Sequence, residues 1–579
     1  MKKNNLKNTL FRLWKFLDLY KGKIVLVIIL NIIATLASVI GPLFAGKAVD
    51  DYIAKMDLDG LKILLFILLA IYFVNSLFNW LSNYGMAKIS ESTLYQIRKR
   101  LFNHLEKLPV SFFDQNKKGD IMSRFTNDVT VISDALTDAL MQIISGLITI
   151  IGVTIIMFFV NWTLAIITIL TTPLFFFFAY KIGVKSGTLY GKQRKNLGVL
   201  SSFSEETFTG INVVKGYVEE EKALNEFEKY NKKLRDTSIK AQIYGHLIMP
   251  INAFIGNLGH ILLICVGSIM IVNGKCSVGV ILSFLSYSNM FRRPINQIAS
   301  LFASLQSALA GANRVFEILD IPSEFVDEKE KIPFDTIEGY VKFKNVDFSY
   351  VKGKKILKSV NLNATPGETI AIVGPTGAGK TTIMNLLTRF YEINKGHIYI
   401  DGIDIRDVKK EDLRKKIGLV LQDTYLFKGT VADNIRYGNK DATMDEIIEA
   451  STLAGAHSFI HRLPNGYNTL ILEEGSNFSQ GERQLISIAR AILANPDILI
   501  LDEATSNVDT KTEKYIQAGM HELMKGRTTF VIAHRLSTIE DANMILVIKD
   551  GKIVERGTHK ELLENGQLYS KLYNSQFDW

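Results

Sequence analysis

A glycine-rich segment in the second half of the sequence has the residue types and spacing of a phosphate-binding loop. The stretch TIAIVGPTGAGKTT joins an apolar strand to a helix start and matches the pattern G-x-x-x-x-G-K-[ST]. Its glycines let backbone N–H groups approach phosphate oxygens, Lys380 can reach the outer phosphates, and the Thr381 hydroxyl can ligate Mg²⁺. We expect ATP and Mg²⁺ to bind at Gly374, Pro375, Thr376, Gly377, Ala378, Gly379, Lys380, Thr381 and Thr382.

Two adjacent carboxylates further along the chain have the chemistry of a hydrolytic centre. The stretch PDILILDEA is a strand of the buried type that ends in Asp502 and Glu503. Asp502 is placed to hold Mg²⁺ through water, and Glu503 is placed to orient or deprotonate the attacking water. A purely structural alternative is that the pair caps the following turn. The phosphate loop in the same domain favours the catalytic role.

The elements that position these residues belong to a domain of alternating strands and helices. From Tyr340 onward the composition is globular, with 31 basic and 30 acidic side chains after Gly339. We predict an α/β P-loop ATPase domain over residues 340–579. The acidic, Pro-containing stretch over 321–339 is predicted to be a linker.

The first part of the chain is predicted to be an α-helical transmembrane domain over residues 1–320. About 20 helical residues cross a bilayer core of roughly 30 Å. Six predominantly apolar runs have this length, and the first is too long to be a cleaved signal peptide. They cover residues 24–46, 63–85, 136–160, 164–182, 248–272 and 278–298.

Charge and cysteine content narrow the class of protein further. The net charge of +9 is concentrated before Gly339, where 36 basic and 28 acidic side chains lie. Lys and Arg are enriched before the first run and in the two long connections, so both termini are expected in the cytoplasm. The excess charge therefore indicates membrane topology, with no nucleic-acid partner. Cys265 and Cys276 are too few for a disulfide scaffold and favour a reducing compartment.

Polar residues inside the apolar runs are candidates for contact with a transported molecule. Several amides and one histidine can line a polar cavity or hydrogen-bond between helices, and the second is the commoner case. Arg292 and Arg293 precede Pro294; they can contact substrate, face a water-filled vestibule or extend toward the interface. The other polar residues in these runs are Asn31, Asn75, Asn79, Asn252, Asn257, His260 and Asn289.

The stretch NFSQGERQLISIARAILANPDILILDEATSNVDT resembles the signature and D-loop region of ATP-binding cassette (ABC) ATPases. Six membrane spans ahead of one cassette resemble an ABC exporter half-transporter of the multidrug and lipid exporter type. The resemblance covers essentially the whole chain, and the ordered motifs carry it. It implies a dimer with a second half-transporter, in which two ATP molecules are held between the two cassettes.

The resemblance also assigns roles to single residues. It makes Tyr350 the aromatic residue that stacks on adenine, and Gln422 the Q-loop residue near Mg²⁺ and the attacking water. It places coupling helices near residues 112–119 and 209–215. The remaining assignments are Ser479 and Gly481 on the partner-bound ATP, Asp509 in the D-loop, His534 on the γ-phosphate, and Glu473 facing the partner's coupling helices.

One position departs from the family pattern. The signature reads FSQGE, with Phe478 where the family usually has Leu, whereas the phosphate loop, Asp502, Glu503 and His534 are intact. In heterodimeric bacterial exporters of this family, one half typically supplies the catalytic Glu while its own signature deviates. The sequence thus favours a heterodimer and leaves a homodimer open.

The expected function is ATP-driven export or flipping of hydrophobic or amphipathic small molecules by alternating access in a bacterial cytoplasmic membrane. ATP bridges the cassettes only when they are closed, so it favours the closed state. A soluble ATPase of DNA repair or translation, an ABC importer, and an ATP-gated channel or regulator are the competing hypotheses. The motifs are shared by drug, lipid and peptide exporters, so the sequence does not identify the substrate.

Overall fold

The computed structural model describes residues 3–135, 137, 140–325, 332–351, 353–422, 424–502, 509–532 and 539–577. Residue contacts divide the chain into two compact units. The membrane unit comprises Met1–Leu105 and Gly119–Asp320, and the cassette unit comprises Glu106–Lys118 and Ile321–Trp579. The short segment Glu106–Lys118, within the predicted transmembrane domain, is thus grouped with the ATPase.

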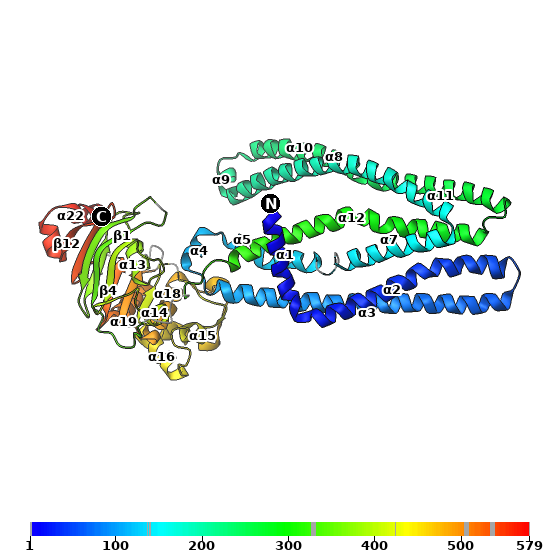
Figure 1. Ribbon diagram of the computed structural model, residues 1–579. Coiled ribbons are helices and arrows are strands. Elements are labelled where there is room, and N and C mark those ends of the chain that lie inside the picture. Colours follow the sequence, from blue (N-terminus) through cyan, green and yellow to red (C-terminus); the bar gives the residue numbers. More distant parts are fainter. Residues whose placement is uncertain are drawn as a thin grey trace. The chain divides into compact units, whose positions relative to one another are not determined.

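The membrane unit consists of helices, because an apolar chain in lipid must satisfy its backbone hydrogen bonds internally. Figure 1 shows α8 and α10 running side by side and joined through the short helix α9. The helices are α1 (Lys3–Leu17), α2 (Lys21–Lys47), α5 (Lys118–Ser123), α6 (Val129–Asp134), α3 (Leu58–Leu105), α7 (Leu140–Val160), α8 (Trp162–Thr209), α9 (Ile211–Gly216), α10 (Glu220–His246), α11 (Ile248–Val272) and α12 (Val278–Leu319).

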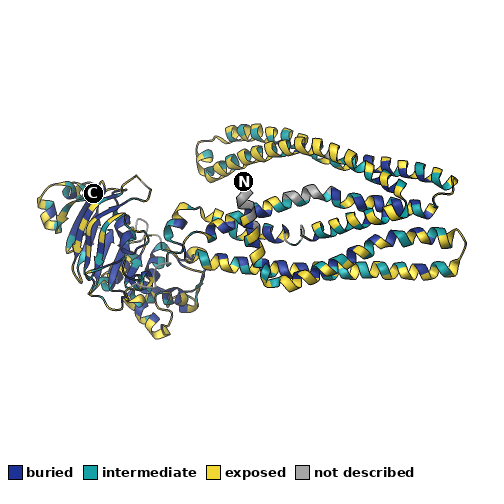
Figure 2. Cartoon of the chain, in the orientation of Figure 1, coloured by how far each residue is buried: buried dark blue, intermediate teal, exposed yellow. Residues whose placement is uncertain are grey.

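Five helical stretches among the described residues are long and apolar enough to cross a membrane. They are Phe11–Ile53, Leu58–Leu105, Met141–Val160, Trp162–Thr209 and Glu220–Val272. The predicted run over 278–298 forms the first half of α12 and is not one of these five. Figure 2 shows many exposed residues along these helices. Large apolar side chains such as Phe66 and Phe159 are among them, as expected of lipid-facing positions. The helical membrane domain is confirmed, whereas the count of six spans stays a prediction.

A buried cluster joins α2, α7, α8, α11 and α12 within the membrane unit. Phe284 and Tyr287 of α12 are completely buried in it, and the Tyr287 hydroxyl donates to the Val39 carbonyl at 3.1 Å. At the start of α12, the Asp50 carboxylate accepts hydrogen bonds from Ser277 Oγ at 2.5 Å and from the Gly279 N–H at 2.7 Å. These contacts fix α12 against α2.

The cassette unit contains two principal sheets, confirming the predicted α/β class. The six-stranded sheet has the order β12-β11-β3-β10-β9-β6; its strands are parallel except for β12. Its strands are β3 (Thr369–Val373), β6 (Ile417–Val420), β9 (Ile498–Asp502), β10 (Thr528–Ile532), β11 (Met544–Lys549) and β12 (Lys552–Gly557). The four-stranded antiparallel sheet, of order β2-β1-β4-β5, comprises β1 (Val341–Phe348), β2 (Leu357–Ala364), β4 (Lys395–Ile400) and β5 (Ile403–Asp404).

Helices cover the six-stranded sheet, whose central strands are almost completely buried (Figure 2). The apolar runs of these strands are those expected of a parallel sheet covered on both faces. The helices of the cassette unit as a whole are α4 (Val110–Gln115), α13 (Lys380–Leu387), α14 (Lys410–Lys415), α15 (Val431–Arg436), α16 (Met444–Leu453), α17 (His457–Ile460), α18 (Gln480–Ala494), α19 (Thr510–Met524), α21 (His559–Glu564) and α22 (Leu568–Phe577).

Candidate functional site

The predicted catalytic segments follow neighbouring parallel strands at one edge of the six-stranded sheet. Ile532, the last residue of β10, pairs with Ile372 of β3 on one side and with Asp502 of β9 on the other. Leu501 of β9 pairs in turn with Val420 of β6. Because the carboxyl ends of parallel strands meet at one edge, the phosphate loop, Asp502 and the segment leading to Gln422 converge there.

Glycines of the phosphate loop are required by the backbone and by close packing. A Cβ at Gly374 would lie 2.2 Å from the Ile548 carbonyl oxygen of β11. Gly379, immediately before α13, has a φ of +109°, and a Cβ there would lie 2.8 Å from Leu357. Gly377 has a φ of +80° and faces open space. The loop therefore presents backbone rather than side chains at the start of α13.

Lys380 is the first residue of α13, and its side chain has polar partners in the loop before that helix. Its Nζ donates to the Gly374 carbonyl at 2.6 Å and to the Pro375 carbonyl at 3.3 Å. Burial lowers the pKa of Lys380, and the nearby charge of Asp502 opposes that shift. The predicted phosphate-binding cation and the predicted Mg²⁺-binding carboxylate are thus electrostatic neighbours.

Tyr350 lies beside the phosphate-loop helix. Its hydroxyl donates to Thr382 Oγ1 at 3.2 Å, and its ring packs edge-on against Tyr391 with centroids 4.8 Å apart. The Tyr391 hydroxyl donates in turn to the Asp114 carboxylate in α4. Burial and the bond to Asp114 raise the pKa of Tyr391. The predicted adenine-binding residue thus connects through one tyrosine to the predicted first coupling helix.

Gln422 and Glu473 line one surface groove of the cassette unit. The groove has a volume of about 400 Å³, and Tyr425, Glu474 and Arg483 also line it. The family resemblance assigned Gln422 to the region of Mg²⁺ and the attacking water and Glu473 to the partner's coupling helices, and the fold places both residues in one groove.

The signature segment forms the N-terminus of α18. Ser479 is the N-cap: its Oγ accepts from the Glu482 N–H at 3.3 Å, and the Glu482 carboxylate accepts from the Ser479 N–H at 2.9 Å. Phe478 is 5% exposed and packs edge-on against Phe459 in the core. Phe478, the residue that departs from the family signature, is therefore part of the core, and its aromatic ring is shielded from solvent.

Of the three remaining predicted residues, only Asp509 is among those that the structure describes. Asp509 is the N-cap of α19; its Oδ1 accepts from the backbone N–H groups of Lys511 at 3.1 Å and Thr512 at 3.0 Å. The Thr512 hydrogen bonds lower the pKa of Asp509. Glu503 and His534 lie outside the described residues, each shortly after a strand of the central sheet.

Sequence relatives match both parts of this architecture. Residues 24–295 match the ABC transporter transmembrane region, and residues 357–506 match the ABC transporter family. The ABC transporter ATP-binding protein YfiC of Bacillus subtilis is 43% identical over 577 residues, covering 100% of this chain and 96% of the relative. The chain belongs to the ABC transporter family.

Two further relatives define the type of transporter. A fatty acid ABC transporter ATP-binding/permease protein of Mycobacterium bovis is 41% identical, covering 89% of this chain and 82% of the relative. A bacterial Atm1-family ABC exporter with ATP bound has a TM-score of 0.77 and 30% identity, covering 96% of this chain and 97% of that structure. This ABC transporter is an exporter whose ATPase domain hydrolyses ATP to drive transport. The soluble-ATPase and importer hypotheses are excluded.

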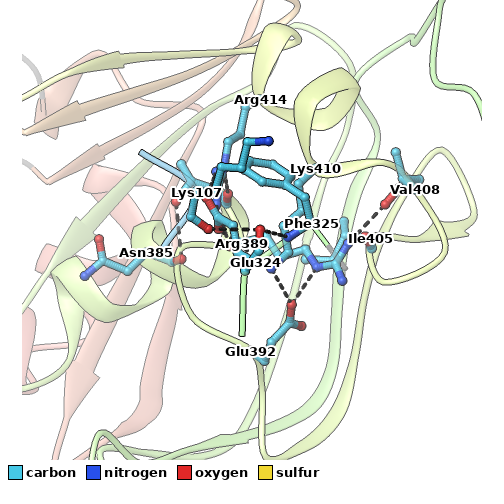
Figure 3. Close-up of polar contacts among 12 residues, drawn as sticks. Lys107, Glu324, Phe325, Asn385, Arg389, Glu392, Ile405, Val408, Lys410 and Arg414 are labelled. Carbon is cyan, nitrogen blue, oxygen red and sulfur yellow. Dashed lines mark hydrogen bonds and ion pairs between the residues drawn. The ribbon is translucent and has the colours of Figure 1, made fainter. Parts of the chain in front are cut away.

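The transporter also contains an ionic cluster that the sequence motifs did not identify. Arg414 of α14 donates to both Glu324 carboxylate oxygens at 2.9 Å, and Lys410 Nζ lies 3.8 Å from one of them (Figure 3). The Glu324 backbone N–H donates to the Lys107 carbonyl at 2.9 Å. The cluster thus joins the segment after α12, the segment before α4 and the helix before β6. No short motif marks Glu324, because its partner is 90 positions away.

Proposed function

We propose that the chain is one half of a dimeric exporter that moves hydrophobic or amphipathic small molecules out of a bacterial cytoplasm. The observation that carries this proposal is the convergence of the phosphate loop, Asp502 and the Q-loop segment at one sheet edge, in a chain with apolar membrane helices. In this proposal α12 contributes the sixth span, and both termini and the cassette are cytoplasmic. A fatty acid transporter among the relatives supports an amphipathic substrate.

In the proposed nucleotide site, backbone N–H groups of residues 374–382 cradle the phosphates and Lys380 moves from its loop carbonyls to the phosphate oxygens. Tyr350 stacks on adenine. Glu503 orients and deprotonates the attacking water, and His534 contacts the γ-phosphate. The ATPase activity then resides at the carboxyl ends of β9 and β10.

Mg²⁺ fits this site by the chemistry of its donors. Thr381, Asp502 and Gln422 would hold the ion through oxygen atoms, the type of donor that Mg²⁺ prefers. When bound, Mg²⁺ neutralises charge that develops on the phosphates.

Two exposed surfaces of this chain, the end of the α8–α10 helical pair and the groove of the cassette unit, support the dimer proposal. α9 ends a long helical pair, and Val213, Tyr217 and Val218 beside it are 62–81% exposed. In the proposed dimer this exposed end lies against the groove lined by Gln422 and Glu473 on a second copy or homologue. In the closed dimer Ser479 and Gly481 contact the ATP of the partner and Asp509 lies at the interface. The heterodimer stays a prediction, and burial of Phe478 removes one reason to consider this signature degenerate.

The test is ATP hydrolysis and transport by purified protein in proteoliposomes, comparing wild type with Glu503→Gln. We expect Glu503→Gln to bind ATP but to lose at least about 100-fold in turnover and to abolish uptake into inverted vesicles. Near-normal turnover in Glu503→Gln would refute the catalytic assignment. ATP-gated current without accumulation would instead support the channel hypothesis. Co-purification of differently tagged copies of this chain distinguishes a homodimer from a heterodimer.

A further inference from the structure

A polar cavity lies inside the membrane unit, between α2, α3, α7 and α12. Its volume is about 470 Å³, within the range of small-molecule sites. Amides and hydroxyls from all four helices line it, and no Asp or Glu lines it among the described residues. The residues that carry the argument are Asn31, Asn79, Asn83, Gln142 and Arg293.

Arg293 supplies the one charged side chain of the described cavity lining. It has no ion pair or side-chain hydrogen bond among the described residues. Its neighbour Arg292 is different: Nη2 donates to Asn289 Oδ1 at 2.6 Å, and the guanidinium lies against Gly256 of α11. Two adjacent arginines thus have different surroundings, one engaged with the helices and one open to the cavity.

Asn31 provides a second, independent sign of a ligand. Its side chain is 6% exposed and lines the cavity, yet Oδ1 has no hydrogen-bond partner. An unpaired buried polar atom costs about 1–3 kcal/mol. Nearby amides partly satisfy one another, as in the 2.7 Å bond from Asn83 Nδ2 to Asn79 Oδ1. Asn31 is therefore poised to accept a hydrogen bond from a bound molecule.

An arginine within a membrane-spanning helix is costly unless an anion or water compensates it. The cavity supplies one cation, several neutral hydrogen-bonding groups and no acidic residue in its described lining. We propose that the cavity binds the headgroup of an anionic amphiphile, with its carboxylate or phosphate on Arg293 and a hydroxyl or N–H on Asn31. This inference rests on the proposed export function and specifies the charge of its substrate.

The experiment measures binding to full-length protein in neutral phosphatidylcholine nanodiscs. The probes are C18 chains carrying a carboxylate, a glycerol phosphate, a trimethylammonium or a neutral alcohol. We expect the carboxylate or the phosphate to bind at least about 10-fold more tightly than the cationic and neutral probes, because the charge-assisted bond to arginine is the discriminating contact. The relative affinities of the two anionic probes identify the preferred headgroup chemistry.

Matched variants assign the effect to this cavity. Arg293→Gln is expected to weaken anionic binding about 10-fold or more and Arg293→Lys less than about 3-fold, with cationic binding unchanged. Arg292→Gln, one residue away, is the control and should retain anionic selectivity. Asn31→Ala should weaken glycerol phosphate more than carboxylate. A monodisperse elution profile verifies folding of each variant.

Equal affinity for anionic and cationic probes in wild type, or undiminished anionic binding to Arg293→Gln, would overturn the proposal. Because binding is measured without ATP, it can also be repeated in Glu503→Gln protein. Selective anion binding without vesicle transport would contradict the export proposal and leave the site intact. Transport without anion selectivity would support the export proposal and contradict the anion-binding site.

Discussion

Replacing Glu324 by Gln should destabilise the cassette unit by removing the anion that two cations share. The Glu324 side chain is 7% exposed, whereas those of Arg414 and Lys410 are 24% and 11% exposed. Glutamine preserves the size of the side chain but leaves both positive charges without this carboxylate. The backbone bond from residue 324 to the Lys107 carbonyl can persist, so the substitution tests the ionic contact alone.

The expected loss is smaller than the full cost of a deeply buried charge. Breaking a buried ion pair by removing one partner typically costs about 3–5 kcal/mol. Here Arg414 still donates to the Arg389 carbonyl at 3.1 Å, and Lys410 still lies 3.2 Å from Glu392. We therefore expect a loss of about 2–3 kcal/mol. For a unit of this size that corresponds to roughly 5–10 °C in Tm.

Calorimetry of the full-length protein in detergent measures the cassette transition. The double-mutant cycle combines Glu324→Gln with Arg414→Met, and the coupling free energy should be about 1–2 kcal/mol. Glu522→Gln is the control, because Glu522 pairs with Lys525 on the surface, where an ion pair is worth at most about 1 kcal/mol. A Glu324→Gln shift no larger than this control, or strict additivity with Arg414→Met, would refute the reasoning.

Two further predictions concern the cassette. Burial opposes ionisation of Asp404, but hydrogen bonds from Arg406 and His397 outweigh it and lower its pKa from 3.8 to about 2. Its stabilisation is therefore complete above pH 3.8 and lost as pH falls toward 2. Asp404→Asn should lower the free energy of unfolding at pH 7 by up to about 2 kcal/mol, and the difference in Tm from wild type should close between pH 4 and 2. A pH-independent difference would contradict this. Phe478→Leu should leave ATP turnover within about 2-fold while costing about 1 kcal/mol of stability, because the ring fills core space; a large gain in turnover would instead indicate a degenerate signature.

The motifs at the carboxyl edge of the six-stranded sheet were predictable because each one is contained in a short stretch of sequence. A glycine loop between strand and helix, or carboxylates at the end of an apolar strand, can be recognised within about ten residues. Strand order was not encoded in any of these segments. The registers of β3, β10, β9 and β6 nevertheless bring Lys380, Asp502 and the segment before Gln422 to one edge, as the family resemblance implied.

Phe478 and Glu324 show what short sequence patterns cannot predict, namely packing and contacts between distant positions. Phe478 stood out because it departs from a motif, and only its packing against Phe459 reveals that the change lies in the core. Glu324 did not stand out, because an acidic residue in an acidic linker has no distinguishing pattern. Its importance arises from Arg414 and Lys107, which the folded chain brings to it from distant positions.

The cassette unit also suggests how nucleotide binding can be sensed by α4, which overlaps the predicted first coupling helix. Under the proposed role of Tyr350, adenine stacks on a ring that contacts Tyr391, and Tyr391 is hydrogen-bonded to Asp114 in α4. A ligand shifts a conformational equilibrium only through contacts that differ between the two states. In this proposal the contacts of Tyr350 with Tyr391 and of Tyr391 with Asp114 form one such set, which links adenine to α4. The Glu324 cluster joins the segment before α4 to the segment after α12 within the same unit, so both segments share one set of contacts with α14.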